Sequence, residues 1–467
     1  MKDLEFLLLQ SLEETAAKIE KREISPVELV KAQLDRIERE DQALNSYITV
    51  NSSGAMEEAE KCELEIASGI YRGPLHGIPI GLKDLIDTAD MKTTCGSGIY
   101  ENHMPKEDAE VVKLLKKAGA IIIGKLNTHQ FAYGPTGDRS HAGPVKNPFN
   151  HAKITGGSSS GSAAAVAAGL SFGTLGTDTG GSVRIPAAFC SVVGMKPTYG
   201  RVSTKGVFPL SSTFDHVGPL TRTMKDNALL LNALIENQED FTRSIGQSLK
   251  GKKIGIESKF YFDNVHPEVE SAILRAIDLF KGLGVQIVDV DMPNMARFSE
   301  AHKVILRSEA YAVHEHLLRD FPDQYDDEVK ERLLTALETT GFDFVKALQD
   351  QERAKQEFNH VLDRVDVLLS PTIPILPPDI NSRYTSASAG ESKDVRWIIT
   401  KLTGPTNLNG LPSLSVPCGF SKDGLPIGLQ LIGREHAEAA LYQFGYALEK
   451  ELSLKPSQYL QKTMIIE

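Results

Sequence analysis

The chain has 467 residues, and its 62 acidic residues outnumber its 51 basic ones, which gives a formal net charge of -11. This balance argues against general binding to a phosphate backbone, which requires a basic stripe. The four cysteines are too scattered for a disulfide scaffold or a zinc knuckle and favour a reducing, cytoplasmic location. We expect no signal peptide, because the apolar run at residues 4–9 lacks a basic flank, and no membrane-spanning segment.

The N-terminal segment, residues 1–65, is predicted to form helices packed on the outside of a core. Ser11 and Glu14 have the spacing of a capping box, and Ser25 repeats the pattern with a proline directly after it. Apolar residues then recur at helical spacing as far as residue 37. We expect no chemistry in this segment.

The pattern changes to alternating strands and helices near residue 75. Residues 78–82 predict a buried strand that ends at Lys83, residues 107–118 predict a helix, and residues 120–123 predict a second strand. A strand, a helix and a strand in series favour a parallel sheet.

Residues 134–219 are rich in glycine, serine, threonine and proline, a composition typical of loops. A small-residue helix is nevertheless predicted at residues 163–168, closed by Gly169. Tight loops that alternate with small-residue helices indicate backbone packed closely around a site.

The second half again predicts an α/β pattern, with no stretch that has the length and composition of a linker. Its expected strands are at residues 253–257, 285–290, 365–369 and 414–417, with helices after residue 266 and through residues 300–362. We therefore predict a single α/β domain over residues 1–467, with a central mixed, mostly parallel sheet covered by helices. Residues 75–220 would form its core, and residues 250–467 would shape a substrate pocket.

Two glycine-rich stretches carry the chemical signal: residues 156–162 (GGSSSGS) and residues 176–187 (GTDTGGSVRIPA). They lack the Gly-Lys-Ser/Thr ending of a phosphate-binding P-loop. A dinucleotide fingerprint would need an acidic residue at the end of a strand about twenty residues further on, and Asp178, which is roughly that far on, sits inside the second glycine motif instead. A Ser-His-Asp hydrolase would also need a histidine base, and the nearest histidines, His141 and His216, lie in no motif of their own.

The two stretches, together with Lys83 upstream, resemble the amidase signature family over nearly the whole chain. Four further motifs support the resemblance: residues 76–84 (HGIPIGLKD), 194–198 (GMKPT), 215–219 (DHVGP) and 424–430 (GLPIGLQ). The resemblance implies the amidase signature fold. It also implies a serine hydrolase that breaks the carbon–nitrogen bond of an amide without a metal or a cofactor.

The resemblance places a catalytic triad on three residues of this chain. Ser182 corresponds to the nucleophile, Ser158 to a bridging serine that the family holds after a cis peptide bond, and Lys83 to the base. A lysine acts as a base only when it is neutral, and burial behind an apolar strand would lower its pKa. Ser158 would then pass the proton of Ser182 to Lys83.

The residues around the nucleophile have supporting roles in this interpretation. The backbone N–H groups of residues 179–182, Thr179, Gly180, Gly181 and Ser182, would form an oxyanion hole that stabilises a tetrahedral intermediate. Asp178 and Arg184 are expected to form a buried ion pair that holds the loop. Cys190 is expected to be a buried structural thiol.

The resemblance leaves two functions open. The first is a stand-alone amidase that converts a small amide to a carboxylic acid and ammonia or an amine. The second is the A subunit of the glutamyl/aspartyl-tRNA amidotransferase, which releases ammonia from glutamine for partner subunits. That subunit usually binds glutamine with a tyrosine-rich helix, an arginine and an aspartate. Here residues 342–366 contain no tyrosine, and Gln351 (close to Arg353) and Thr400 stand at the expected arginine and aspartate positions, which favours the first function.

The expected partner is a small-molecule amide substrate, without direct contact to a nucleic acid or a membrane. Partner subunits are expected only for the second function, and a homodimer is the default oligomer. Loops of the second half would form the pocket walls, together with Phe131, Phe208 and Trp397. The acyl group of the substrate leaves no transferable pattern in the sequence.

Overall fold

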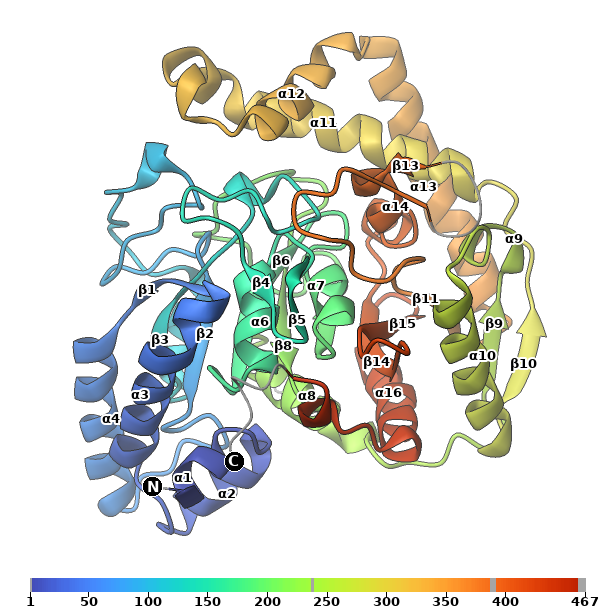
Figure 1. Ribbon diagram of the computed structural model, residues 1–467. Helices are drawn as coiled ribbons and strands as arrows, with labels where there is room; N and C mark the ends of the chain where they lie inside the picture. Colours follow the sequence, from blue (N-terminus) through green and yellow to red (C-terminus); the bar gives the residue numbers. More distant parts are fainter. Residues whose placement is uncertain (1, 237–238, 387–391, 461–467) are drawn as a thin grey trace.

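The computed structural model describes residues 2–236, 239–386 and 392–460 (Figure 1). Its centre is an 11-stranded sheet in the order β1-β3-β2-β6-β8-β7-β14-β15-β11-β9-β10. These strands are β1 (Tyr47–Val50), β2 (Pro79–Lys83), β3 (Ile121–Leu126), β6 (Gly173–Asp178), β7 (Val193–Lys196), β8 (His216–Thr221), β9 (Lys253–Ile256), β10 (Gln286–Asp289), β11 (Val367–Pro371), β14 (Ser413–Phe420) and β15 (Pro426–Ile432). Two small hairpins pair β4 (Lys146–Asn147) with β5 (Asn150–Ile154) and β12 (Tyr384–Thr385) with β13 (Lys393–Asp394).

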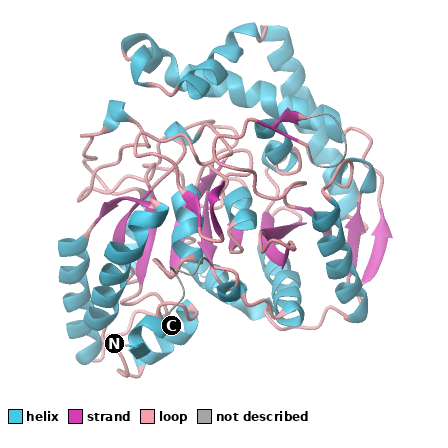
Figure 2. Cartoon of the chain, viewed as in Figure 1, coloured by secondary structure: helices cyan, strands magenta, loops and turns pink. Residues whose placement is uncertain are grey.

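Helices flank most of the strands, and strands β9 and β10 lie at one edge of the molecule (Figure 2). The helices of the first half are α1 (Lys2–Leu7), α2 (Leu12–Glu20), α3 (Pro26–Leu44), α4 (Ser52–Ala67), α5 (Glu110–Lys117), α6 (Ser160–Ala167), α7 (Arg184–Phe189) and α8 (Met224–Ala233). Those of the second half are α9 (Ser258–Tyr261), α10 (Pro267–Gly282), α11 (Met295–Asp320), α12 (Asp327–Leu334), α13 (Gly341–Leu362), α14 (Val395–Thr400), α15 (Gly404–Leu408) and α16 (Glu438–Leu452). None of the helices in the described part of the chain has the length and apolar character needed to cross a bilayer.

The predicted caps of the N-terminal helices are confirmed. Ser11 and Ser25 precede α2 and α3, and each forms a complete capping box. Ser11 Oγ accepts from Glu14 N at 3.1 Å, and Ser25 Oγ accepts from Glu28 N at 3.3 Å. Each box pairs backbone donors that a helix start leaves free, so these short motifs fix where the two helices begin.

The mixed sheet covered by helices is confirmed, but its parallel share is smaller than predicted. Strands β2, β3 and β6 are parallel neighbours, as are β9, β10 and β11. The remaining six pairings of this sheet are antiparallel. The strand-helix-strand pattern at residues 78–123 therefore predicts the parallel pairing of β2 and β3 but not the strand directions in the rest of the sheet. Strands β14 and β15, for example, are joined by a tight turn around Gly424, which produces an antiparallel pair.

The topology brings two chemically important strand ends together. Strands β2 and β6 are parallel and adjacent, with Leu82 opposite Leu175. The carboxyl ends of both strands therefore lie at one edge of the sheet, next to the loops that follow β5 and β6. Helices α11, α12 and α13 form a helical cap (residues 295–362) over this end of the molecule (Figure 1).

Candidate active site

Lys83 is the last residue of β2, and its side chain is fully buried. Its Nζ lies 2.7 Å from Ser158 Oγ and 2.7 Å from Thr177 Oγ1. Burial disfavours the ammonium form and lowers the pKa of Lys83 to about 7, although the charges of Asp178 and Asp215 act in the opposite direction. A substantial fraction of Lys83 is therefore neutral near pH 7.

Ser158 is held by its backbone at the entrance to α6. The peptide bond between Gly157 and Ser158 is cis. The carbonyl of Ser158 accepts hydrogen bonds from His129 N at 3.1 Å and from Thr128 Oγ1 at 3.0 Å. A Cβ atom at Gly157 would lie 2.9 Å from Gly134 O, so a larger residue would displace this loop. These contacts direct the Ser158 hydroxyl toward Lys83.

Ser182 lies on the loop between β6 and α7, and 9% of its surface is exposed. Its carbonyl accepts from Ser159 N at 3.2 Å, which places this loop beside the loop that carries Ser158. The preceding Gly181 has a φ of +124°, and a Cβ atom there would lie 2.3 Å from Thr403 Oγ1. Only glycine fits this position without strain.

The backbone donors of this loop differ in their pairing. The N–H of Gly181 already donates to Asp178 Oδ1 at 2.8 Å. Within the described chain, the N–H groups of Thr179, Gly180 and Ser182 donate to no protein acceptor. The expected set of four donors therefore contains one that is occupied inside the protein.

Asp178 and Arg184 form the buried ion pair that the sequence predicts. Arg184 Nη2 lies 2.9 Å from Asp178 Oδ1, and both side chains are fully buried. Although burial acts to raise it, the Arg184 guanidinium holds the pKa of Asp178 well below its usual value. Arg184 also donates to three side chains of the second half: Thr406, Asn407 and Gln430. The pair fixes the loop that carries Ser182 to α15 and β15.

The family model named Amidase matches residues 28–442 of this chain. The chain belongs to the amidase family. Among curated proteins it is 38% identical to the A subunit of the glutamyl-tRNA(Gln) amidotransferase of Geobacter sp. (strain M21), over 94% of this chain and 97% of that protein. It is 36% identical to the corresponding protein of Staphylococcus carnosus (strain TM300), over 95% of this chain and 98% of that protein.

Solved structures of amidases and of an amidotransferase component both resemble this amidase-family chain. A crystal structure of an amidase has a TM-score of 0.89 at 34% identity and covers 95% of this chain and 100% of the other. The peptide amidase from Stenotrophomonas maltophilia has a TM-score of 0.84 at 29% identity, with 96% and 97% covered. The A subunit of the glutamyl-tRNA(Gln) amidotransferase from Thermotoga maritima has a TM-score of 0.79 at 31% identity, with 98% of each chain covered. The protein is thus a hydrolase of amide bonds.

A cavity of about 420 Å³ opens beside Ser182. Its walls combine the loop that carries Ser182 with α11, α12 and α14; Trp397 lies in them as expected, and Thr400 lies beside it in the lining. Phe208 instead lines a smaller neighbouring cavity. Phe131 is buried behind it, with ring centroids 5.3 Å apart.

Gln351 lies outside this cavity, which corrects its expected position in a substrate site. Its Nε2 donates to Leu408 O at 3.0 Å, and the residue lines a separate cavity. The guanidinium groups of the substrate cavity come from other helices, on Arg307, Arg332 and Arg396. The identity of residue 351 thus gives no information on which amide is bound.

Sequence reasoning missed four residues that contact the site. Thr177 contacts Lys83, and Asp215 Oδ1 accepts from Thr179 Oγ1 at 2.6 Å. His302 Nε2 lies 2.9 Å from Thr179 O, and Thr403 Oγ1 donates to Gly180 O at 2.7 Å. Thr177 and Asp215 stand inside motifs quoted for the family, so their motif membership was an available signal. His302 and Thr403 stand in no motif.

Among the described residues, no histidine side chain is hydrogen-bonded to a serine hydroxyl. Burial lowers the pKa of His302 to about 4 and that of His216 to about 3, so both are neutral near pH 7. His216 Nδ1 lies 2.6 Å from Phe214 O. In the part of the chain that the structure describes, no group of three or more His, Cys, Asp and Glu side chains could hold a metal ion.

Proposed function

We propose that Ser182 attacks the carbonyl carbon of an amide while Ser158 and Lys83 take up its proton. The carbon–nitrogen bond then breaks, and the nitrogen leaves as ammonia or an amine with a proton returned from Lys83 through Ser158. Water, deprotonated along the same route, hydrolyses the acyl-enzyme and restores Ser182. Each step uses only side chains of this chain and a water molecule.

The observation that carries the proposal is the 2.7 Å contact between Lys83 Nζ and Ser158 Oγ in a fully buried setting. A neutral lysine accepts a proton, and the Ser158 hydroxyl can donate to Lys83 while it accepts from Ser182. The hydroxyl of Ser182 has no hydrogen-bond partner among the described residues, so it is free to turn toward Ser158.

Backbone donors beside Ser182 support the same chemistry. The unpaired N–H groups of Thr179, Gly180 and Ser182 are available to an oxyanion, whereas Gly181 N–H is bound to Asp178. Preorganised donors of this kind stabilise a tetrahedral intermediate because they need not reorient during the reaction. We assign the oxyanion hole to these three groups. The N–H of Gly181 instead stabilises the conformation of the loop through its hydrogen bond to Asp178.

The lysine base predicts a specific pH dependence. Because burial lowers the pKa of Lys83 to about 7, the neutral base is depleted below that pH and dominant above it. We expect kcat/KM to rise about tenfold per pH unit well below the pKa and to level off above it. In Asp215→Asn the rising limb should move to lower pH, because the negative charge of Asp215 raises the pKa of Lys83.

A pH series of initial rates at constant ionic strength would measure this limb. A profile that is flat from about pH 5 to 9 would contradict a lysine base in this pKa range. Movement of the limb to higher pH in Asp215→Asn would contradict the sign of the charge effect.

A second candidate function is supported by the comparisons. The curated relatives described above are A subunits of amidotransferases, at 36% and 38% identity over nearly the full chain. The solved structures include free amidases as well as one such A subunit. Gln351 lies away from the substrate cavity and so no longer favours the free amidase, whereas Thr400, at the expected aspartate position, does line the cavity. An amidotransferase component that releases ammonia from glutamine is therefore the second candidate function, beside the free amidase.

The deciding experiment is ammonia release by the purified chain alone, from a panel of simple amides and from glutamine. Ser182→Ala serves as the control for chemistry at this site. Turnover of simple amides by the chain alone supports the free amidase. Turnover that requires glutamine and added amidotransferase partner subunits supports the alternative, and activity that persists in Ser182→Ala rejects both.

A further inference from the structure

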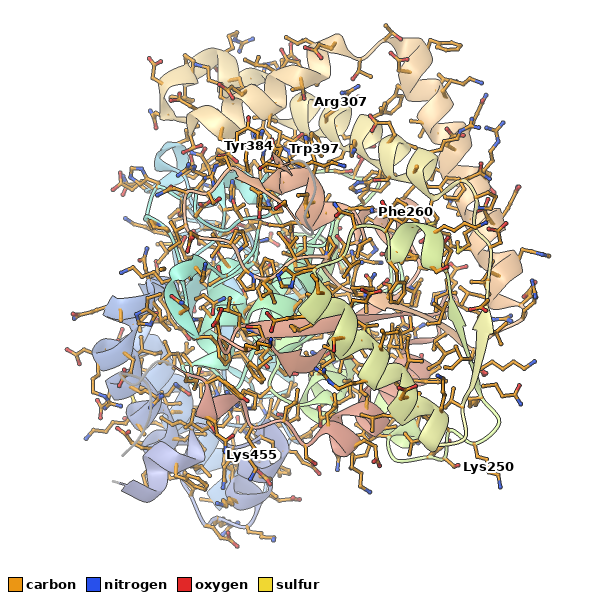
Figure 3. All side chains as sticks on the ribbon, turned by 45° about the vertical axis from the view of Figure 1, so that its right-hand side comes forward. Lys250, Phe260, Arg307, Tyr384, Trp397 and Lys455 are labelled. Carbon is orange, nitrogen blue, oxygen red and sulfur yellow. The ribbon has the colours of Figure 1, made fainter. Side chains whose placement is uncertain are left out.

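Two arginines of the helical cap line the substrate cavity and have no carboxylate partner among the described residues. Arg307 lies on α11, and its Nε is buried and has no hydrogen-bond partner in the described chain. Arg332 lies on α12 with its Cζ 4.3 Å from the ring centroid of Tyr133 and 5.9 Å from that of Trp397. Neither forms an ion pair with a described residue. Figure 3 shows Arg307 at the helical cap and Trp397 below it, toward the rest of the molecule.

The other charged groups of the cavity are already paired or face solvent. Lys303 Nζ lies 3.1 Å from Glu300 Oε2. Arg396 is paired with Asp394, with contacts of 3.0 Å from its Nε to both carboxylate oxygens. The remaining acidic residues in the lining are exposed: Glu331 and Glu338. Arg307 and Arg332 are therefore the charges of this cavity that lack a protein counter-ion among the described residues.

The two arginines and the nucleophile lie on different walls of one cavity. Ser182 and the loop that carries it form one wall, and the cap helices α11 and α12 form the other. A substrate whose amide reaches Ser182 would extend its far end toward the cap. Both arginines are half-buried, so a ligand that pairs them gains charge-assisted hydrogen bonds that water screens only in part.

We propose that the cavity takes an amide whose far end carries a carboxylate, which Arg307 and Arg332 bind. This inference rests on the proposed function, because it places the amide carbonyl at Ser182. The planar guanidinium donates two parallel hydrogen bonds to a carboxylate, and the rings of Tyr133 and Trp397 hold Arg332 in a defined orientation. Monoamides of short dicarboxylic acids have this chemistry, and glutamine shares it with an added ammonium group.

The test compares each monoamide with its diamide, which replaces the carboxylate by an uncharged group of the same shape. Malonamate, succinamate and glutaramate are assayed beside malonamide, succinamide and glutaramide, with glutamine in parallel. For the member of best fitting length, the wild-type kcat/KM should favour the carboxylate by about 10- to 100-fold. Arg307→Gln and Arg332→Gln should each reduce that ratio at least about 10-fold.

The matched control is Arg319→Gln, which removes a guanidinium from the same helix as Arg307 at a position where it pairs with Asp320 outside the cavity. It should leave the ratio unchanged. Calorimetric binding of the carboxylates and diamides to Ser182→Ala gives the same comparison without turnover.

The outcomes separate this inference from the proposed function. Equal use of carboxylates and diamides, with a ratio that neither arginine variant changes, overturns the carboxylate assignment while hydrolysis at Ser182 stands. Hydrolysis that survives in Ser182→Ala overturns the proposed function instead. Use of glutamine alone, lost in both arginine variants, supports the carboxylate assignment and identifies an amino acid as the substrate.

Discussion

Replacing Ser182 by alanine is expected to lower kcat for amide hydrolysis by about 10⁴-fold or more, because the covalent route is lost. Lys83→Met should cause a similar loss, since Ser182 is a weak nucleophile until a base takes its proton. The two residues act on one step, so the double variant should be barely less active than either single variant. Rates of ammonia release from one good substrate measure all three.

The free energy of unfolding shows whether Lys83→Met loses activity through its chemistry or through misfolding. Lys83 is fully buried with its pKa lowered to about 7, so the folded state binds fewer protons than the unfolded state below the ordinary lysine pKa. Stability is then lost as pH falls from that ordinary value toward about 7. Lys83→Met removes this cost, and we expect the free energy of unfolding at pH 7 to rise by roughly 1–3 kcal/mol. Lost hydrogen bonds to Ser158 and Thr177 would offset part of the gain.

Thr177→Val is the matched comparison, because it removes one hydrogen bond to Lys83 Nζ and leaves the base in place. Its effect on kcat should be far smaller than that of Lys83→Met. Losses in Ser182→Ala and Lys83→Met that multiply in the double variant would show that the two residues act on separate steps. A Lys83→Met protein that keeps most of its activity would exclude the lysine as the base.

The central part of the site could be predicted because it is built from short motifs. Lys83, Ser158 and Ser182 each stand in a stretch of sequence whose backbone conformation is determined locally, by glycines and strand ends. The Asp178–Arg184 pair is separated by only a few residues, so one loop creates it. Local determinants of this kind are visible in a single sequence.

The parts that escaped prediction depend on contacts between distant segments. His302 on α11 and Thr403 just before α15 meet the loop that carries Ser182, from more than a hundred residues away along the chain. Their positions follow from how the second half packs on the sheet, which leaves no periodic pattern. The antiparallel pairings of β7, β8 and β14 were missed for the same reason, since the hydrophobic pattern of a buried strand does not reveal its direction.

The buried Asp178–Arg184 pair leads to the second large effect. We expect Arg184→Met to lower the free energy of unfolding by about 3–5 kcal/mol, because it leaves a fully buried carboxylate without its counter-charge. The partners that Arg184 satisfies in the second half, such as Gln430 Oε1 at 2.6 Å, would also lose their donor. Denaturant-induced unfolding followed by circular dichroism would measure the change, and activity should fall with it as the nucleophile loop loosens.

The double variant Asp178→Asn/Arg184→Met separates the cost of an unpaired charge from the loss of packing. It should recover part of the stability that Arg184→Met loses, because an amide in place of the carboxylate needs no counter-ion.

The pH dependence of the stability gives a second check with a definite sign. Without Arg184, burial is opposed only by the smaller effects of Lys196 and Asn407, so the pKa of Asp178 rises and the ionised carboxylate destabilises the fold more as pH rises. The deficit of Arg184→Met relative to the wild type should therefore be smaller at pH 5 than at pH 8, whereas in the double variant it should not change between these pH values. A deficit that is equal at both pH values in Arg184→Met would show that Arg184 acts through packing and hydrogen bonds instead of through its charge.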